Sequence, residues 1–387
     1  MTQKITSYLL SIALLVSCIS KQVDSNIIRV NDAKQVKLNL SDYVLSLEYV
    51  PLETKKECLI DRDPSFYVLD EYIVATTMQQ CFLFNRNGKF IREIGRPGRG
   101  PDEYSSTLRG EIVNEQTQTI LLQGWDKRIE YSFDGTVTKN FPKIPDSSTE
   151  SAYVSDSILV QGIHNFIGNA TNQLIFYNQE KVVDSIPNYQ FFTPMDPNAF
   201  GGFGVEFSFY RYRDELYYKN IYNDTIFRFQ DKKLHPVWIF DMEQYHLPRS
   251  VMANMNTIRQ ETVKYNRLLN LWETDPFILF SIIREKGDSA FVFDKRKHQV
   301  FVMSKEQKLK GFHNDLDGGM PFWPIRINQK QEMISFLYPN VMKEMLTNEY
   351  FEQKNIRNSY AHLRLKELLN MVKEDDNPVV VIARLKL

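Results

Sequence analysis

The feature that most limits how this chain can fold is a pattern of short strand-like runs and turns that recurs along most of its length. In the clearest copy, apolar residues flank the turn Asn85–Gly88. Asn-Gly between alternating apolar runs is the strongest short-range signal for a β-hairpin. An aromatic residue precedes the turn in four successive copies: Phe84, Tyr131, Phe176 and Phe227. Their spacing of roughly 45 to 50 residues is typical of the blades of a β-propeller.

Each copy supplies about four strands, and an isolated four-stranded sheet cannot bury both of its faces. Stacking the sheets radially around an axis buries these faces. A fifth copy covers 277–304, and a sixth combines 325–338 with a last apolar run at 378–385. If that run pairs with 43–52, the ring closes. We therefore predict an all-β fold, a six-bladed β-propeller closed by its N- and C-terminal strands. A pair of β-sandwiches fits the interval less well.

Two stretches break the strand pattern and predict helical insertions near 250–272 and 340–373. In the first, apolar residues recur at alternating steps of four and three from Val251 to Trp272, as on one face of a helix. A similar stripe runs from Ala361 to Val372. We expect both stripes to pack on the propeller, and binding of a partner protein is the alternative.

The first residues resemble a bacterial lipoprotein signal. The apolar run Tyr8–Val16 follows Lys4 and is shorter than the ~20 residues that span a bilayer. Ser17 then precedes Cys18, as a small residue precedes a cysteine that carries lipid. We predict a signal peptide at 1–17, a lipidated N-terminus and tether at 18–40 and the propeller at 41–387. The anchor would hold the protein in the cell envelope, either in the periplasm or at the cell surface. An ordinary cleaved signal and a chance cysteine are the alternatives.

Charge and composition exclude some functions. The chain has 47 lysine and arginine against 48 aspartate and glutamate residues, so there is no electrostatic case for binding nucleic acid. The 26 phenylalanines and 20 tyrosines favour strands. Apart from Cys18, the cysteines are Cys58 and Cys81. They are either two buried free thiols or a disulfide, and no Cys/His spacing suggests zinc.

Several motifs occur together in a fixed order. They are Tyr49–Thr54, Gly95–Tyr104, Gly311–Gly319, Pro321–Pro324 and Asn377–Lys386. With the Cys18 motif, they resemble the six-bladed β-propeller lipoprotein family of gut Bacteroidetes, whose relatives include NHL-type propellers. The resemblance covers nearly the whole mature chain. It implies a fold and a cell-envelope location, and it carries over no catalytic residues. Where the family loop commonly has a glycine, this chain has Asp102.

The loop Gly95–Tyr104 is the first candidate for ligand binding. Its three glycines and two prolines exclude regular structure, and a charged loop that follows a strand is a common place for binding groups. We expect Arg96, Arg99 and Tyr104 to face the central mouth of the propeller. The alternative is a tight connector in which Arg and Glu pair with each other.

The second candidate is the loop Asn314–Gly319 with the tryptophan that follows it. Asp315 and Asp317 resemble half of a calcium loop, but the terminal glutamate of an EF-hand is missing. A structural turn and a direct ligand contact are the other interpretations. Trp323 either stacks on a sugar or peptide or is buried between blades. We expect no cofactor, with calcium as the alternative.

Arginines in connectors give a third candidate, because guanidinium groups match carboxylates. Arg128, with Arg211 and Arg213, would line a pocket for a carboxylate or form surface or inter-blade pairs. No nucleophile-elbow, zinc-protease or phosphate-loop motif is present.

We therefore predict a binding or sensing module for a small molecule, glycan fragment or peptide. One alternative is an NHL-like enzyme, a metal-dependent lyase or a hydrolase. The lyase would need His164, His298 and His313 to converge on the axis. The other alternative is a platform for an envelope protein partner.

Overall fold

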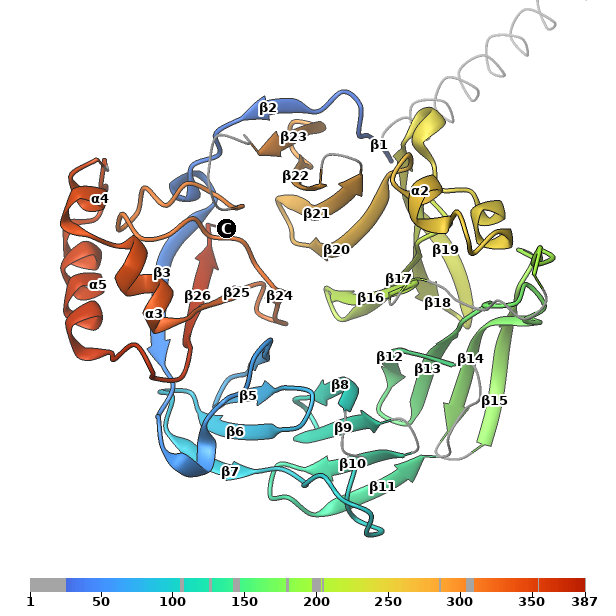
Figure 1. Ribbon diagram of the computed structural model, residues 1–387, viewed down its shortest axis with the longest axis horizontal. Helices are drawn as coiled ribbons and strands as arrows, with labels where there is room; N and C mark the ends of the chain where they lie inside the picture. Colours follow the sequence, from blue (N-terminus) through green and yellow to red (C-terminus); the bar gives the residue numbers. More distant parts are fainter. Residues whose placement is uncertain are drawn as a thin grey trace, which may run out of the picture.

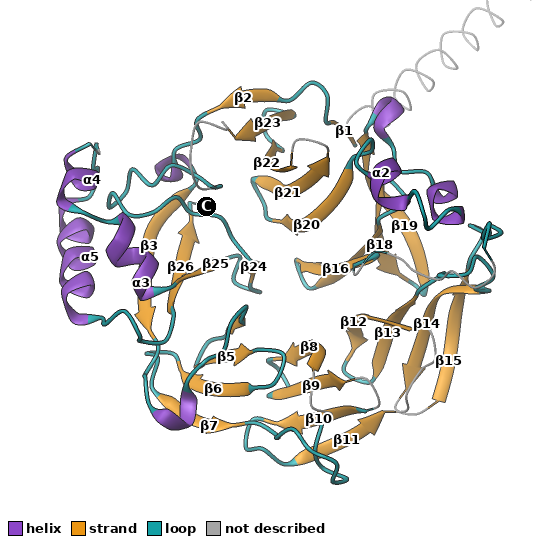
Figure 2. Cartoon of the chain, viewed as in Figure 1, coloured by secondary structure: helices purple, strands orange, loops and turns teal. Residues whose placement is uncertain are grey.

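The computed structural model describes residues 26–104, 108–124, 127–141, 147–178, 181–196, 203, 205–284, 287–303, 310–353 and 355–386. Six sheets stand in a ring around a central axis (Figures 1 and 2). The chain is a six-bladed β-propeller, as predicted.

The blades follow the order of the chain, and the first strand of each four-stranded repeat is the innermost. Blade 1 holds β4 (Ser65–Val68), β5 (Tyr72–Thr76), β6 (Cys81–Asn85) and β7 (Phe90–Glu93). Blade 2 holds β8 (Leu108–Asn114), β9 (Thr119–Gly124), β10 (Arg128–Ser132) and β11 (Val137–Phe141). Blade 3 holds β12 (Ser147–Ser155), β13 (Ile158–Ile163), β14 (Asn172–Asn178) and β15 (Lys181–Pro187).

The second half of the ring carries two additional N-terminal strands. Blade 4 holds β16 (Phe207–Tyr212), β17 (Glu215–Asn220), β18 (Thr225–Gln230), β19 (Lys233–Asp241) and β1 (Ile27–Arg29). Blade 5 holds β20 (Arg267–Glu273), β21 (Phe277–Arg284), β22 (Gly287–Asp294), β23 (Gln299–Met303) and β2 (Lys34–Val36). Blade 6 holds β24 (Arg326–Ile327), β25 (Met333–Leu337), β26 (Val379–Leu385) and β3 (Val44–Pro51).

The predicted closing strand is confirmed. β26 pairs antiparallel with β3, so a strand that precedes blade 1 in the chain and the last strand of the chain build one blade. Part of the segment 18–40, predicted as a lipidated N-terminus and tether, is paired with the ring. Residues Ile27–Arg29 and Lys34–Val36 pair parallel with the outermost strands of blades 4 and 5. They fasten the N-terminal segment to the outside of the ring before it enters blade 6.

Because the strands of each blade run antiparallel, the connections fall on two faces. We call one the turn face: it carries the tight turns between the first and second and between the third and fourth strands. We call the other the insertion face: it carries the remaining connections, including 164–171, 188–206, 242–266 and 338–378. The α-helices lie in connections of this second kind.

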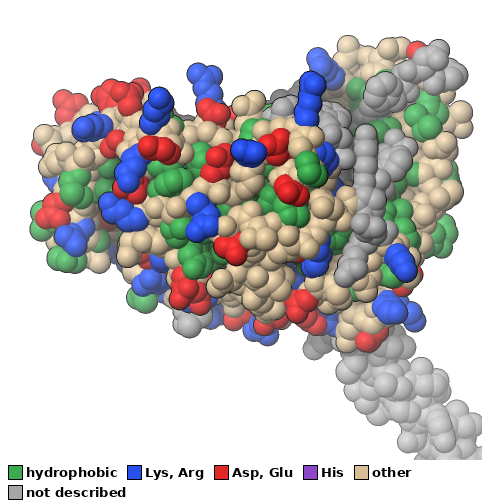
Figure 3. Space-filling model, turned by 90° about the horizontal axis from the view of Figure 1, so that it is seen from below, with side chains coloured by type: hydrophobic (Ala, Val, Ile, Leu, Met, Phe, Trp, Pro, Cys, Tyr) green, Lys and Arg blue, Asp and Glu red, His purple; other side chains and the backbone are tan. Residues whose placement is uncertain are grey.

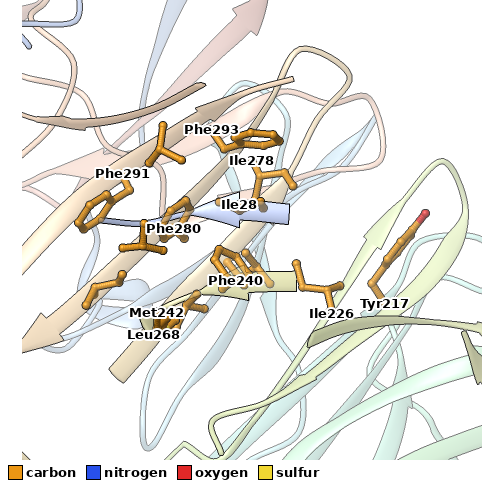
Figure 4. Packing of buried hydrophobic residues seen from close by; sticks show 14 residues of the cluster. Ile28, Tyr217, Ile226, Phe240, Met242, Leu268, Ile278, Phe280, Phe291 and Phe293 are labelled. Carbon is orange, nitrogen blue, oxygen red and sulfur yellow. The ribbon is translucent and has the colours of Figure 1, made fainter. Parts of the chain in front are cut away.

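Each pair of neighbouring blades is joined by a hydrophobic cluster. One cluster combines Phe66 and Phe84 of blade 1 with Val380 of blade 6. Figure 4 shows the cluster between blades 4 and 5, in which Ile28 of β1 lies among Phe240 and Phe280. Equivalent clusters join the other neighbours in turn. The core is therefore a closed circle of interfaces, as radial stacking requires.

The first helical insertion is shorter than predicted. It consists of η3 (Glu243–Tyr245), η4 (Arg249–Ala253) and α2 (Ile258–Thr262), and Arg267–Glu273 is the strand β20. The register of β20 shifts between Leu269 and Trp272, and Asn270 has φ +48°. Leu269 and Trp272, the last two residues of the predicted stripe, pair with Ser281 and Leu279. The bulge thus places two residues three positions apart on one face of the strand, which imitates the period of a helix.

The second insertion agrees with the prediction. It contains α3 (Pro339–Met345), α4 (Asn348–Glu352) and α5 (Ser359–Met371). Leu365, Leu368 and Val372 are buried together with Met342 and Phe351 against blade 6. The predicted stripe thus packs on the propeller. Two further 3-10 turns are η1 (Leu40–Asp42) and η2 (Lys56–Cys58).

Surface charge is mixed. In the side view of Figure 3, acidic, basic and apolar side chains alternate without a large region of one sign. Cys58 and Cys81 are both buried as free thiols. In the part of the chain that the structure describes, no helix is both long and apolar enough to cross a bilayer.

Candidate functional site

A cavity of about 520 Å³ lies on the axis of the ring. The cavity is lined by the innermost strand of each blade: β4, β8, β12, β16, β20 and β24. In each of these strands, the lining residues are those nearer the turn face. The aromatic and ionisable side chains of the lining are Tyr67, Glu111, Glu115, Tyr153, Asp156, Phe209, Tyr210, Arg211, Asp214, Trp272, Glu273 and Arg326. All six blades contribute, so the axial channel is the candidate site.

The backbone of the innermost strands makes this channel polar. Each strand is hydrogen-bonded to a neighbouring strand on one side only, so part of its N–H and C=O groups has no strand partner. Side chains of the next blade reach some of them. Arg326 Nε donates to the carbonyl of Phe66 at 3.2 Å, and an Arg211 guanidinium nitrogen donates to the carbonyl of Tyr153 at 2.6 Å.

Arg326, Tyr67 and Glu111 form a cluster where blades 6, 1 and 2 meet at the channel. The guanidinium carbon of Arg326 lies 3.5 Å from the centroid of the Tyr67 ring, a cation–π contact. The Tyr67 hydroxyl donates to Glu111 Oε1 at 3.2 Å, and an Arg326 nitrogen lies 4.0 Å from the same oxygen. Burial, with the charge of Glu111, raises the pKa of Tyr67, so its hydroxyl remains a donor.

Glu273 belongs to a second, fully satisfied cluster. Its carboxylate accepts hydrogen bonds from Tyr210 at 2.7 Å and from Trp238 at 3.2 Å, and it pairs with Lys295 at 2.6 Å. Burial lowers the pKa of Lys295, although Glu273 opposes this effect. The cluster ties blade 4 to blade 5 and leaves Glu273 little capacity for a ligand.

The mouth of the channel on the turn face is acidic. Glu115, Asp156 and Asp214 line the channel near the ends of their strands, and the ion pairs of the described residues include none of the three. Asp70 is paired with Lys330 at 2.5 Å. Overall, the described lining contains five carboxylates, counting Glu111 and Glu273, and two guanidinium groups. The site therefore disfavours anions.

The predicted position of Gly95–Tyr104 is wrong. The loop leaves β7, the outermost strand of blade 1, and lies at the outer rim of the ring, not at the central mouth (Figure 1). The Tyr131 hydroxyl donates to the carbonyl of Asp102 at 3.0 Å, and Lys127 Nζ donates to that of Glu103 at 3.2 Å. Gly95 has φ +63° and lies against the ring of Tyr131.

The side chains of this loop fit the alternative of a self-satisfied connector. Arg96 Nε pairs with Glu103 Oε1 at 2.8 Å, while Gly100 N donates to Glu103 Oε2 at 2.8 Å. That backbone hydrogen bond and the charge of Arg96 lower the pKa of Glu103. Tyr104 is completely buried, and its hydroxyl donates to the carbonyl of Gln79. Arg99 is exposed, away from the channel.

Arg128 lies between blades 2 and 3 and not in the channel. Its guanidinium lies over the rings of Phe141 and Tyr177, at 5.5 and 5.4 Å, and donates to Gln161. Burial lowers its pKa to about 10. The hydrophobic cluster here is small, so Arg128 has the inter-blade role that was the alternative to ligand binding.

Asp315 and Asp317 hold chain segments together. Asp315 accepts hydrogen bonds from the amide and hydroxyl of Ser41, at 2.9 and 2.5 Å, and pairs with Arg357 at 2.8 Å. Burial alone would raise the pKa of Asp315, but these hydrogen bonds and the charge of Arg357 lower it. Asp317 accepts from Tyr49 and Asn314, and burial raises its pKa. These contacts agree with the interpretation of the loop as a structural turn.

Trp323 is half-buried between blades 5 and 6. Its ring lies 6.2 Å from that of Trp272 and 6.1 Å from that of Phe312. It supports Trp272, which lines the channel, but does not line it itself. The lipidation residue, Cys18, lies outside the described residues.

The three histidines proposed for a lyase do not converge. His164 lies in the connection between the second and third strands of blade 3, His298 in an outer turn of blade 5, and His313 beside Asn39. None is among the channel-lining residues. Within the described ranges, no group of three or more His, Cys, Asp or Glu residues is placed to hold a metal ion.

Sequence reasoning found one channel residue, Arg211, and missed the others. The missing step was to identify the first strand of each repeat as the innermost one. The last residues of that strand and its turn then give Glu115, Asp156 and Asp214 at equivalent places in three blades.

A solved structure shares this fold over nearly the whole chain. A protein described as exported, from Bacteroides fragilis NCTC 9343, is 17% identical with a TM-score of 0.72, over 93% of this chain and 100% of that chain. The extracellular domain of a one-component system from B. thetaiotaomicron is 12% identical with a TM-score of 0.40, over 74% and 32% of the two chains. No curated protein matches this chain. The profile described as Domain of unknown function (DUF4934) matches residues 25–384, and the chain belongs to this family.

Proposed function

We propose that the protein is a cell-envelope binding module that takes its ligand in the axial channel, through the mouth on the turn face. The observation that carries this proposal is the cavity of about 520 Å³ lined by all six blades. Its volume lies within the range of ~300 to 1,000 Å³ typical of small-molecule sites. The polar strand edges supply donors and acceptors in several directions.

The lining narrows the class of ligand. Carboxylates outnumber guanidinium groups, so we expect a neutral or cationic ligand, not a phosphate or an acidic sugar. Tyr67 and Phe209, which are both half-buried, offer aromatic surface for stacking. A neutral glycan fragment or a peptide with basic groups fits this lining.

Asp214 gives a direct test. It lies at the mouth, in the turn between β16 and β17, with φ +61°. Asn tolerates this backbone conformation, so Asp214→Asn removes the charge and keeps the turn. We expect a ligand found by calorimetric screening of glycan and peptide libraries to bind Asp214→Asn at least several-fold more weakly.

Asp231→Asn is the matched control. Asp231 has φ +51° and belongs to the turn between β18 and β19 of the same blade, at the outer rim. We expect this variant to bind like the wild type. Equal losses in both variants, or a ligand that binds both normally, would exclude the channel mouth as the site.

We further propose that the protein is anchored through lipid on Cys18. The support is the Leu15–Cys18 motif and the resemblance to a lipoprotein family. The alternative of a metal-dependent lyase lacks such support, because none of its three candidate histidines lines the channel. Mass spectrometry of the N-terminal peptide tests the anchor: acyl chains on Cys18 are expected, and an unmodified cysteine would refute it.

A further inference from the structure

Three connections on the insertion face form one continuous layer over blades 3 and 4. Asn165 Nδ2 of the first donates to the carbonyl of Gln190 in the second at 2.8 Å. Met195 N of the second donates to the carbonyl of Ala253 in η4 at 2.8 Å. The layer is therefore a defined part of the fold.

Several large apolar side chains that are close together in the sequence are exposed on this layer. Tyr189 is 81% exposed, Phe191 58% and Met195 75%. Ile167, in the adjoining connection, is 46% exposed. The segment 187–196 contains one acidic residue, Asp196, and no basic residue. Exposed apolar side chains grouped in this way mark a surface that binds a membrane or another protein.

The start of the fold lies close to this layer. Asn26 accepts a hydrogen bond from Ile239 N at 2.9 Å, and Ile27 pairs with Ile239, two positions before the end of β19. The connection to η4 follows directly after β19. Cys18 precedes Asn26 by eight positions, so it lies at most about 29 Å away. That length reaches either face of the ring, and the exposed apolar side chains decide between them.

We propose that the insertion face over blades 3 and 4 docks on the phospholipid bilayer, with Tyr189, Phe191 and Met195 in contact with the lipid. This inference rests on the lipid anchor of the proposed function. Aromatic side chains favour the interfacial region of a bilayer, and an anchor within reach gives a weak apolar contact a high effective concentration. The channel mouth on the turn face then points away from the membrane.

The test uses the full lipidated protein in phosphatidylcholine vesicles. Single cysteines, Tyr189→Cys and Val183→Cys, carry a fluorescent label, and lipids with a shallow nitroxide quench it. Val183 is a matched position, because it is 51% exposed on β15 of blade 3, near the turn face. The native thiols Cys58 and Cys81 are both 0% exposed, so they stay unlabelled.

We expect quenching at residue 189 to exceed that at residue 183 several-fold, and Phe191→Ser with Met195→Ser to remove most of the difference. Equal quenching at the two positions, or stronger quenching at 183, overturns the proposal. So does a fluorescent label at 189 that stays unquenched in vesicles, while a photo-crosslinker at the same position captures one protein in intact cells. A mass that shows an unmodified Cys18 refutes the lipid anchor, and the docking proposal with it. The Asp214→Asn binding experiment tests the channel separately, so the two failures can be told apart.

Discussion

At the scale of single residues, His246 provides a contact that depends on pH. Its Nδ1 lies 2.5 Å from Asp224 Oδ2 and ties the connection after β19 to blade 4. The hydrogen bond to Asp224 raises the pKa of His246. A raised pKa in the folded state gives stability that is fully present below the unfolded pKa of about 6.5 and is lost as pH rises through the folded pKa.

We therefore expect His246→Gln to destabilise the protein more at mildly acidic pH than at alkaline pH. Urea denaturation at several pH values above the carboxylate range measures the difference from wild type. His298→Gln is the control, since His298 has no carboxylate partner among the described residues. A difference for His246→Gln that grows with pH would contradict this account.

At the scale of elements, the short strand β1 contributes to the core. Ile28 is completely buried in the cluster between blades 4 and 5 (Figure 4). Ile28→Ala should cost about 2 to 5 kcal/mol of unfolding free energy, as other buried Ile-to-Ala changes do. Ile239 of β19 is 39% exposed, so Ile239→Ala should cost well under half as much. Chemical denaturation of both variants tests this, and equal costs would mean that β1 is not part of the cooperative core.

The same elements explain what the sequence could predict. Hairpins such as the one at Asn85–Gly88 and the closing strand β26 carry their own periodic signal, so they were predicted correctly. β1 and β2 have three residues each, too few for any period. The bulge in β20 imitated a helix. The channel could not be predicted from local patterns, because its lining comes from six separate strand ends.

The two candidate loops were predicted to bind a ligand for a related physical reason. Glycine, proline and paired charges are required both where a chain binds a ligand and where it crosses between blades. In Gly95–Tyr104, Glu103 satisfies Arg96 and Gly100 within the loop itself. In the other loop, Asp315 joins Ser41 to Arg357. Sequence gives the chemistry of such loops, but the position relative to the axis decides their role.

At the scale of the whole molecule, ring closure should make the six blades unfold together. An open array of repeats can lose one end while the rest stays folded. Here blade 6 pairs β3, which precedes blade 1 in the chain, with the last strand, β26, and Val380 of β26 is completely buried against blade 1. Val380→Ala should cost about 2 kcal/mol through lost burial and a cavity. If the ring is one cooperative unit, the same loss of unfolding free energy appears in every blade.

Native-state hydrogen exchange measures that loss in each blade separately. We expect Val380→Ala to lower the protection of β13 and β14, in blade 3 across the ring, by the same free energy as that of β25 in blade 6. Val182 of β15 is 59% exposed, so Val182→Ala should leave both regions within about 0.5 kcal/mol of wild type. If Val380→Ala weakens blade 6 alone, the blades unfold independently. In that case, the channel would keep its shape on one side while it opens on the other.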